Sequence, residues 1–373
     1  MSGVVYFDNA ATTLCKPKAV PEGVRRSILH CASPGRGGHA PAMAAAEVVY
    51  RCRKAAAELF KADDPEKIVF TSSATHGLNI AINSLVRPGT RVAISGYEHN
   101  AVTRPLHAIG ADVRVAAGRL FNGEEVVENF RKELENGAKV VILNHISNVF
   151  GFIQPAEEVA RLCKKYGAAM ILDASQSAGS VDIDAGGMGC AFIALPGHKG
   201  LYGPQGTGIL ICGAEPKPLI FGGTGSESKS QDMPPYLPDA LEAGTANVPG
   251  IAGLLEGINY VNQTTPAAIM AHQRKITRHI GEKLQEIGGF RVYLARKSEN
   301  QAGVLSVVKE GTDSEETAQI LGEMGFAVRA GMHCAPLAHR TAGTLDTGTV
   351  RISPSSFNTL RQADMLIKAL SRL

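Results

Sequence analysis

Short apolar runs alternate with longer segments of helical periodicity over the first two thirds of the chain. The apolar runs predict strands at 67–70, 91–95, 140–143, 168–172, 191–195 and 208–212. Between them, the spacing of apolar positions predicts helices at 42–60, 78–85, 123–135 and 155–166. Such alternation is typical of an α/β fold with a largely parallel sheet that is buried on both faces. We therefore expect ligands to bind at the carboxyl ends of the strands.

The pattern changes in the last third of the chain. Residues 213–249 are rich in Gly, Pro and Ser, and a long helical stretch is predicted at 251–287. The strands predicted after it lie at 304–309, 327–329 and 349–352, and the helices at 314–324 and 357–370. We predict a large α/β domain at 15–250 and a small α+β domain formed by 1–14 and 251–373.

Composition excludes several classes of partner. The chain has 373 residues, a formal net charge of +3 without a basic block, 5% aromatic residues and no Trp, so we expect no nucleic-acid partner. No run approaches the roughly 18 apolar residues of a membrane span, and the N-terminus lacks the features of a signal peptide. The seven cysteines form no C-x-x-C pair, which indicates neither a metal site nor a disulfide framework. We therefore expect a cytoplasmic protein without membrane contact.

A lysine and an aspartate end two neighbouring predicted strands. Lys199 follows the strand at 191–195, and Asp173 closes the strand at 168–172. A lysine amine can form an imine with pyridoxal phosphate, and a carboxylate can keep the pyridine nitrogen of that cofactor protonated. Gln176 could donate a hydrogen bond to the phenolate oxygen. An Asp after a strand is also often a helix cap, but its coincidence with Lys199 favours the cofactor.

Three further polar positions follow predicted strands. Residues 71–77 lead into a helix whose free N–H groups could hold a phosphate with the Thr75 hydroxyl, or could be closed by an ordinary N-cap. His99 could stack on an aromatic cofactor and move protons. The Asn148 amide can reach the same space. Taken alone, a His or Asn in a loop is more often structural.

Cys334 differs in context from the other cysteines. It lies in a loop bounded by Gly and Pro, next to His333, where an exposed thiol near cationic groups can be nucleophilic. A buried inert cysteine is the alternative. Arg351 follows on a short predicted strand, and its guanidinium suits a bidentate contact with a substrate carboxylate. A structural salt bridge would use the same side chain.

Together these motifs resemble the fold-type I, class V aminotransferase family, and within it the cysteine desulfurases. The resemblance runs nearly end to end, through 6–13, 73–79, 98–100, 173–176, 197–199, 202–204, 242–245, 331–334 and 350–351. The compact interval between Cys334 and Arg351 resembles the second, selenocysteine lyase-like group. The family's fold has a mostly parallel seven-stranded sheet in a large domain and a small α+β domain, which would carry Cys334 and Arg351.

The resemblance implies a role for each matching residue. Lys199 would be the Schiff-base lysine, His99 the ring-stacking residue and Cys334 the persulfide-forming nucleophile. The other roles are pairing with the pyridine nitrogen by Asp173, contact with the phenolate by Gln176, phosphate binding by Thr75 and His198 with Ala74 beside them, and carboxylate binding by Asn148 and Arg351. Thr245 would reach the phosphate of the other subunit, which implies a homodimer with composite sites. Arg36 and His39 would line the substrate entrance.

Two positions depart from the family pattern. Pro196 stands where many relatives carry Ser, and Ala74 lacks a hydroxyl often found beside Thr75. Each missing hydrogen bond to a charged phosphate would cost about 1.5–3 kcal/mol unless backbone groups or Ser72 compensate. We therefore expect weaker cofactor binding than in those relatives.

The activity implied is conversion of L-cysteine to L-alanine. Lys199 would remove the α-proton, the Cys334 thiolate would attack the substrate sulfur, and His99 would donate protons. The resulting persulfide would pass to an acceptor protein that the sequence does not identify. The alternatives are a selenocysteine lyase or selenium-delivering homologue acting on L-selenocysteine, a β-lyase or aminotransferase acting on another amino acid, and a sulfur-relay scaffold with a vestigial cofactor site.

Overall fold

The fold is built around a seven-stranded sheet in the order β2-β8-β7-β6-β5-β3-β4. A computed structural model describes residues 3–35 and 37–373 of the chain. The strands are β2 (Ile68–Thr71), β3 (Arg91–Ser95), β4 (Asp112–Ala116), β5 (Val140–Asn144), β6 (Ala169–Asp173), β7 (Phe192–Pro196) and β8 (Gly208–Cys212). Neighbouring strands are parallel except for β8, which is antiparallel to both β2 and β7. The predicted α/β fold with a mostly parallel sheet is confirmed.

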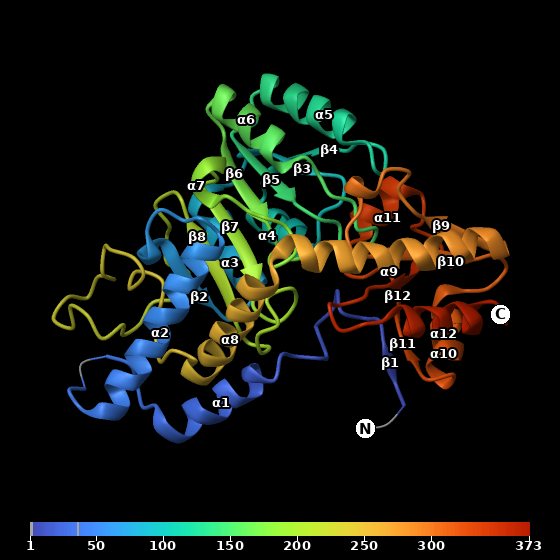
Figure 1. The fold of residues 1–373 in the computed structure, drawn as a ribbon. Helices are drawn as coiled ribbons and strands as arrows, with labels where there is room; N and C mark the ends of the chain where they lie inside the picture. The colour runs from blue at the N-terminus through green and yellow to red at the C-terminus, as the bar shows by residue number, and fades with distance from the viewer. Residues whose placement is uncertain (1–2, 36) are drawn as a thin grey trace.

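Helices cover both faces of this sheet, because the central strands β5, β7 and β8 carry buried side chains on both faces. In β5, Val141 and Leu143 pack on one face, while Val140 and Ile142 pack on the other. The second face is covered by α3 (Ala74–Leu85) and α4 (Asn100–Ile109). The first face is covered by α2 (Ala40–Leu59), α5 (Gly123–Glu135), α6 (Ala156–Tyr166) and α8 (Val248–Thr264), with α1 (Ala19–His30) packed on α2 and α8 (Figure 1).

A second, antiparallel sheet forms from the C-terminal third in the order β12-β13-β10-β9. Its strands are β9 (Phe290–Tyr293), β10 (Leu305–Lys309), β12 (Arg329–Gly331) and β13 (Thr349–Ile352). The helices around it are α9 (Pro266–Ile287), α10 (Ser314–Glu323) and α12 (Leu360–Leu370). Figure 1 shows β1 (Val5–Tyr6) beside β11 (Phe326–Ala327), with which it pairs in parallel. The opening residues therefore join the C-terminal part of the fold.

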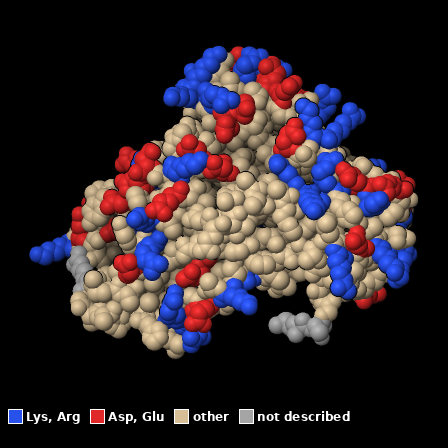
Figure 2. All heavy atoms as spheres, in the orientation of Figure 1, with Lys and Arg blue, Asp and Glu red and all other residues tan. Residues whose placement is uncertain are grey.

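The remaining elements are short. They are α7 (Ala185–Met188), α11 (Pro336–Ala342) and two 3₁₀ turns at Pro65–Lys67 and Ser298–Asn300. Within the described residues, no helix is both long and apolar enough to cross a membrane. On the face drawn in Figure 2, Lys and Arg are interspersed with Asp and Glu, so neither sign of charge dominates it.

The helix predicted at 251–287 is two helices, α8 and α9. The helix is interrupted at Thr265, which has a φ of 71°, and α9 begins at Pro266. A proline fits the first helical position because its missing N–H would have no helical partner there. The Thr265 side chain caps α9 by accepting from the Ala268 N–H at 3.3 Å. Since α8 packs on α1 and α2, the division of the chain at 250/251 stays a prediction.

Candidate active site

The candidate site lies where the parallel strands end. Because β3, β5, β6 and β7 run in the same direction, the residues that follow them meet at one edge of the sheet. A cavity of about 90 Å³ occupies this edge. Its lining combines strand ends with the start of α3, and consists of Ser73, Ala74, Thr75, His99, Ala101, Asn144, Asn148, Asp173, Ser175, Gln176, Pro196, His198 and Lys199.

Lys199 lies on the turn after β7, and the N-terminal segment holds that turn. The Thr13 N–H and hydroxyl both donate to the His198 carbonyl at 3.1 Å. Lys16 Nζ donates to the carbonyls of His198 (3.3 Å) and Gly203 (2.8 Å), which bracket the turn. Burial lowers the pKa of Lys199 to about 8, although the charge of Asp173 opposes the shift. Part of the Lys199 amine is therefore unprotonated near neutral pH and can act as a nucleophile or base.

Asp173 ends β6 and is buried, with 2% of its surface exposed. Its Oδ1 accepts from the Ser175 N–H at 2.9 Å, so the local turn uses one oxygen only. Asn144 is its register partner on β5, and the Asn144 Oδ1 atom is buried without a partner among the described residues. Gln176 donates from Nε2 to the Ala10 carbonyl at 2.9 Å. These side chains place unused acceptors at the cavity.

The start of α3 also lines the cavity. The Ser73 hydroxyl caps the helix by accepting from the His76 N–H at 3.2 Å. At the first positions of a helix the backbone N–H groups lack intrahelical partners, and Ala74 and Thr75, at the start of α3, line the cavity. Gly208 of β8 permits this arrangement, because a Cβ there would lie 2.7 Å from the Ser73 carbonyl carbon. The N-cap and the anion site predicted for 71–77 are thus compatible.

Both histidines of the cavity are held in defined orientations. His99 caps α4, and its Nδ1 accepts from the Ala101 N–H at 3.0 Å, which leaves the proton of the neutral ring on Nε2. Burial lowers the pKa of His99 despite the nearby charge of Asp173. His198 Nδ1 lies 3.1 Å from Thr12 Oγ1, and burial lowers its pKa to about 4. Both rings are therefore neutral at pH 7.

Cys334 is exposed on the turn that leads into α11. His333 and Cys334 both have positive φ, 49° and 56°, which side chains other than Gly rarely adopt. Asn148 Nδ2 donates to the His333 carbonyl at 2.8 Å, and the Asn100 N–H donates to the Cys334 carbonyl at 2.8 Å. The turn is therefore tied to a cavity residue and to the residue that follows His99. By contrast, burial raises the pKa of the Cys163 thiol to about 12.

Arg351 on β13 is buried and already paired. Its Nη2 lies 2.7 Å from Asp8 Oδ1, and its Nη1 donates to the Asn148 carbonyl at 3.0 Å. The Nε atom is buried without a partner among the described residues. The salt bridge considered as the alternative for Arg351 is present, and the Nε–H of its guanidinium remains unused by the described residues.

Among the predicted residues that the structure describes, those that do not line this cavity are Cys334, Arg351, His39 and Thr245. His39 is exposed and caps α2 through its Nδ1, which accepts from the Ala42 N–H at 3.4 Å. Thr245 is exposed on the segment before α8. Arg36 lies outside the described residues. Their roles at a substrate entrance or in a second subunit stay predictions.

The sequence reasoning missed several residues of the site. Asn144 could have been found as the last residue of the strand next to Asp173. Asp8 and Arg329 belong to motifs that were recognised for other residues. Glu98, next to His99, is fully buried, and burial raises its pKa to about 8. A buried carboxyl group has no signature in the sequence.

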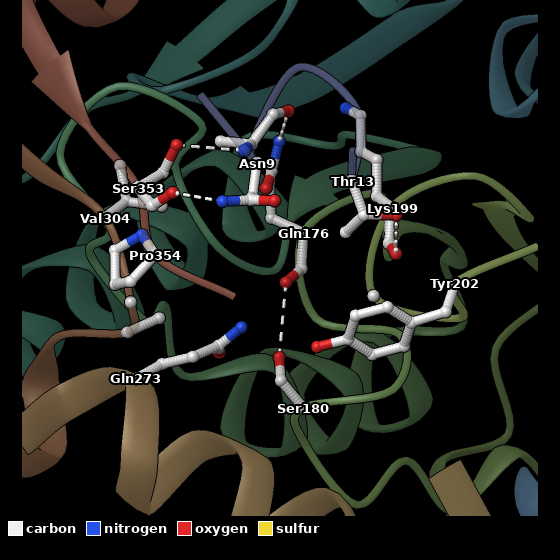
Figure 3. A pocket seen from close by; sticks show the side chains of 14 residues that line it. Asn9, Thr13, Gln176, Ser180, Lys199, Tyr202, Gln273, Val304, Ser353 and Pro354 are labelled. Atoms are coloured by element: carbon white, nitrogen blue, oxygen red, sulfur yellow. Dashed lines mark hydrogen bonds between the residues drawn. The ribbon is translucent and has the colours of Figure 1, made fainter. Parts of the chain in front are cut away.

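A second, smaller cavity lies next to the first. Figure 3 shows Asn9, Gln176, Ser353 and Gln273 around it, contributed by the N-terminal segment, the large sheet and the C-terminal third. Asn9 Nδ2 donates to the Ser353 carbonyl at 2.9 Å. Gln176 and Lys199 line both cavities. The N-terminal segment, which holds the Lys199 turn through Thr13, is therefore also bonded to the C-terminal third through Asn9.

Comparisons with known proteins identify the family of the chain. The model of the class-V aminotransferase family matches residues 5–366. A probable cysteine desulfurase of Methanothermobacter thermautotrophicus is 32% identical over 99% of this chain and 94% of its own. The solved cysteine desulfurase of Thermococcus onnurineus superimposes with a TM-score of 0.90 at 30% identity, over 99% of this chain and 94% of that one. The Escherichia coli cysteine desulfurase CsdA gives 0.86 at 25% identity with the same coverage.

Proposed function

The chain belongs to the class-V aminotransferase family and is similar over its whole length to cysteine desulfurases, and from this premise we propose that it converts L-cysteine to L-alanine and retains the sulfur on Cys334. One observation carries the proposal. The turn of Cys334 is hydrogen-bonded to Asn148, which lines the Lys199 cavity, and to Asn100, which follows the cavity residue His99. The turn that carries the exposed thiol is thereby tied to the part of the fold that holds Lys199, whose pKa is lowered.

The cavity residues fit pyridoxal 5'-phosphate as the cofactor. Lys199, the buried Asp173 and the first residues of α3 line one space. Asn148 Oδ1 and Asn144 Oδ1 are buried acceptors without partners in the described part of the chain, as expected where a polar ligand completes a site. When bound, this cofactor supplies an aldehyde that joins an amino group and a ring that accepts electrons from the α-carbon.

Each side chain contributes a separate function to cofactor binding. Lys199 would join the aldehyde, Asp173 would pair with the ring nitrogen and His99 would stack on the ring. Gln176 would donate to the phenolate oxygen, while Ala74 and Thr75 with His198 would hold the phosphate. The two family hydroxyls missing at Ala74 and Pro196 leave the start of α3 as the main phosphate contact. The Ser72 hydroxyl lies 3.5 Å from His76 Nδ1, at the same helix start.

Proton movements in the reaction follow from the pKa values. Lys199, with a pKa lowered to about 8 by burial, can take the α-proton of the substrate at Nζ and return it. His99 carries a proton on Nε2 and could donate it to the substrate. Asn148 and Arg351 would orient the α-carboxylate. The Cys334 Sγ then bonds to the substrate sulfur while the bond between that sulfur and Cβ breaks, and a proton replaces the sulfur at Cβ.

The proposal includes the oligomeric state, the sulfur acceptor and the cellular compartment of the enzyme. A homodimer would bring the exposed Thr245 to the phosphate of the neighbouring site, with Arg36 and His39 at the substrate entrance. The persulfide on the exposed Cys334 would pass to an acceptor protein. Because all seven cysteines are free thiols, we infer a reducing, cytoplasmic setting.

The test measures products and the persulfide separately. We expect the purified enzyme with L-cysteine to release alanine and to gain one sulfur atom on Cys334, seen by mass spectrometry. Cys334→Ser should do neither, while Cys15→Ser, which removes another exposed thiol, should match the wild type. Alanine release with a persulfide in Cys334→Ser would refute the proposal, and a keto-acid product would indicate a β-lyase or aminotransferase. L-Selenocysteine that reacts equally well in Cys334→Ser would indicate a selenocysteine lyase, because selenium can leave without attack by the thiol.

A further inference from the structure

Two arginines lie directly opposite each other on neighbouring strands of the small sheet. Arg329 of β12 and Arg351 of β13 are direct register partners in an antiparallel pair. Directly opposite residues carry their side chains on the same face, with Cβ atoms about 5 Å apart. Like charges in this arrangement destabilise a sheet. A neighbouring negative charge is therefore expected.

Among the described residues, a carboxylate pairs with one of the two arginines and none pairs with the other. Asp8 pairs with Arg351 at 2.7 Å. Arg329 is exposed, and it has neither an ion pair nor a side-chain hydrogen bond with any residue in the ranges 3–35 and 37–373. One guanidinium of the pair is thus neutralised, and the other is open to a ligand.

The open guanidinium belongs to the strand that precedes the Cys334 turn. Burial is the main cause of the lowered pKa of Lys199 and of His99, and the charges of Arg351 and Arg329 lower both further. The same two charges add to the lowering at His333, which precedes Cys334. These effects accord with the position of Arg329 opposite Arg351 in the sheet. Four residues separate Arg329 from Cys334 in the sequence.

We propose that Arg329 is a substrate-binding residue that forms an anion clamp with Arg351 and receives the α-carboxylate of the amino acid. This inference rests on the proposed function, whose substrate it concerns. The Arg351 Nε atom has no partner among the described residues, so both arginines retain donors for a carboxylate. A carboxylate between them would remove the like-charge repulsion. The clamp would select α-amino acids over thiols that lack a carboxylate.

The clamp also connects substrate binding to the nucleophile. β12 leads directly into the turn of His333 and Cys334. A carboxylate held by Arg329 would fix the strand from which that turn departs. The substrate sulfur and the Cys334 thiol would then be positioned by the same strand.

The experiment compares ligands with and without a carboxylate on the cofactor-loaded enzyme. We expect Arg329→Gln to raise KM for L-cysteine and Kd for L-alanine roughly 10- to 100-fold, with kcat changed less than about threefold. The affinity for ethylamine should not change in Arg329→Gln. The KM and Kd of Arg329→Lys should lie between those of the wild type and those of Arg329→Gln. Arg340→Gln, which removes an exposed arginine of α11, is the matched control and should resemble the wild type.

Thermal unfolding provides a second measurement. Without ligand, Arg329→Gln should melt at or above the wild-type temperature, because it relieves the repulsion, and it should lose the stabilisation by L-alanine. An unchanged Kd for L-alanine, or equal weakening of L-alanine and ethylamine, would overturn the clamp. Unchanged amino-acid binding with slower alkylation of Cys334 would instead assign Arg329 to the thiol. If the enzyme releases no alanine but its Kd for L-cysteine still depends on Arg329, the proposed function fails and the clamp stands.

Discussion

Asn148 Nδ2 donates to the backbone carbonyl of His333 at 2.8 Å, across 185 positions of the sequence. Asn148 lines the Lys199 cavity, and His333 precedes Cys334 in a turn with two consecutive positive φ angles. Such backbone conformations cost about 1–3 kcal/mol each and persist where surrounding contacts enforce them. A residue of the cavity therefore holds the exposed thiol in position.

Asn148→Ala should slow sulfur transfer to Cys334 more than it weakens cofactor binding. It removes a buried hydrogen bond to the strained turn, which is worth about 1–3 kcal/mol and predicts a roughly 10- to 100-fold lower rate of persulfide formation. Single-turnover mass spectrometry of the Cys334 peptide measures this rate. Asn83→Ala, which removes an asparagine hydrogen bond within α3, is the control and should leave the rate unchanged. An unchanged rate in Asn148→Ala would show that this hydrogen bond to the turn does not affect sulfur transfer to Cys334.

Gly208→Ala should weaken cofactor binding. The added Cβ would lie 2.7 Å from both the Ser73 carbonyl carbon and Thr71 Oγ1, so the start of α3 must shift. We expect a loss of about 1–3 kcal/mol in stability and at least a tenfold higher Kd for pyridoxal phosphate, measured by absorbance titration. Gly322→Ala is the control, because that exposed helical glycine has open space around it and alanine should stabilise α10 by up to about 1 kcal/mol. Normal cofactor affinity in Gly208→Ala would show that the helix start does not hold the phosphate.

Glu98 should make the stability of the protein depend on pH. Its Oε1 accepts from Ser95 Oγ at 2.5 Å and from the Asn144 N–H at 2.8 Å, while Oε2 is buried without a partner among the described residues. Burial raises its pKa from near 4.5 to about 8, so the folded state holds an extra proton between these values. The free energy of unfolding should therefore fall by about 1.4 kcal/mol per pH unit as the pH rises through this window.

Glu98→Gln should remove this slope, because glutamine stays neutral. Urea unfolding at several pH values from 6 to 9 should show the variant gaining stability relative to the wild type with rising pH, up to about pH 8 and not beyond. Glu124→Gln, at an exposed position of α5, should leave the slope unchanged. Parallel curves for Glu98→Gln and the wild type would mean that Glu98 is already ionised at pH 6.

Lys199 should be the lysine that joins the cofactor. Borohydride reduction of the enzyme loaded with pyridoxal phosphate should add the cofactor mass to the Lys199 peptide and to no other. Lys16 is the internal comparison, because burial lowers its pKa to about 8 as well, but its Nζ already contacts Thr13 Oγ1 at 2.6 Å and the Gly203 carbonyl. Lys199→Ala should abolish the label. Label on Lys16, or a label retained in Lys199→Ala, would contradict the assignment.

The fold class could be predicted from the sequence because local patterns determine it. Alternation of apolar strands with amphipathic helices requires a sheet covered on both faces, and parallel strands bring their carboxyl ends together. Asp173, Lys199 and His99 therefore met at one edge, as their positions after predicted strands indicated. The exact end of a strand does not follow from its apolar run. Asn144 was missed because β5 is one residue longer than that run.

Other features depended on contacts between distant residues. The pairing of Asp8 with Arg351, the register of Arg329 opposite Arg351 and the break between α8 and α9 all involve choices that local pattern leaves open. Side-chain pairing and strand register are selected by packing energies summed over the whole chain, to which each residue contributes little. The sequence alone determined the class of fold and the chemical groups at its strand ends. Only the tertiary structure decided which of those groups are already paired and which remain free for a ligand.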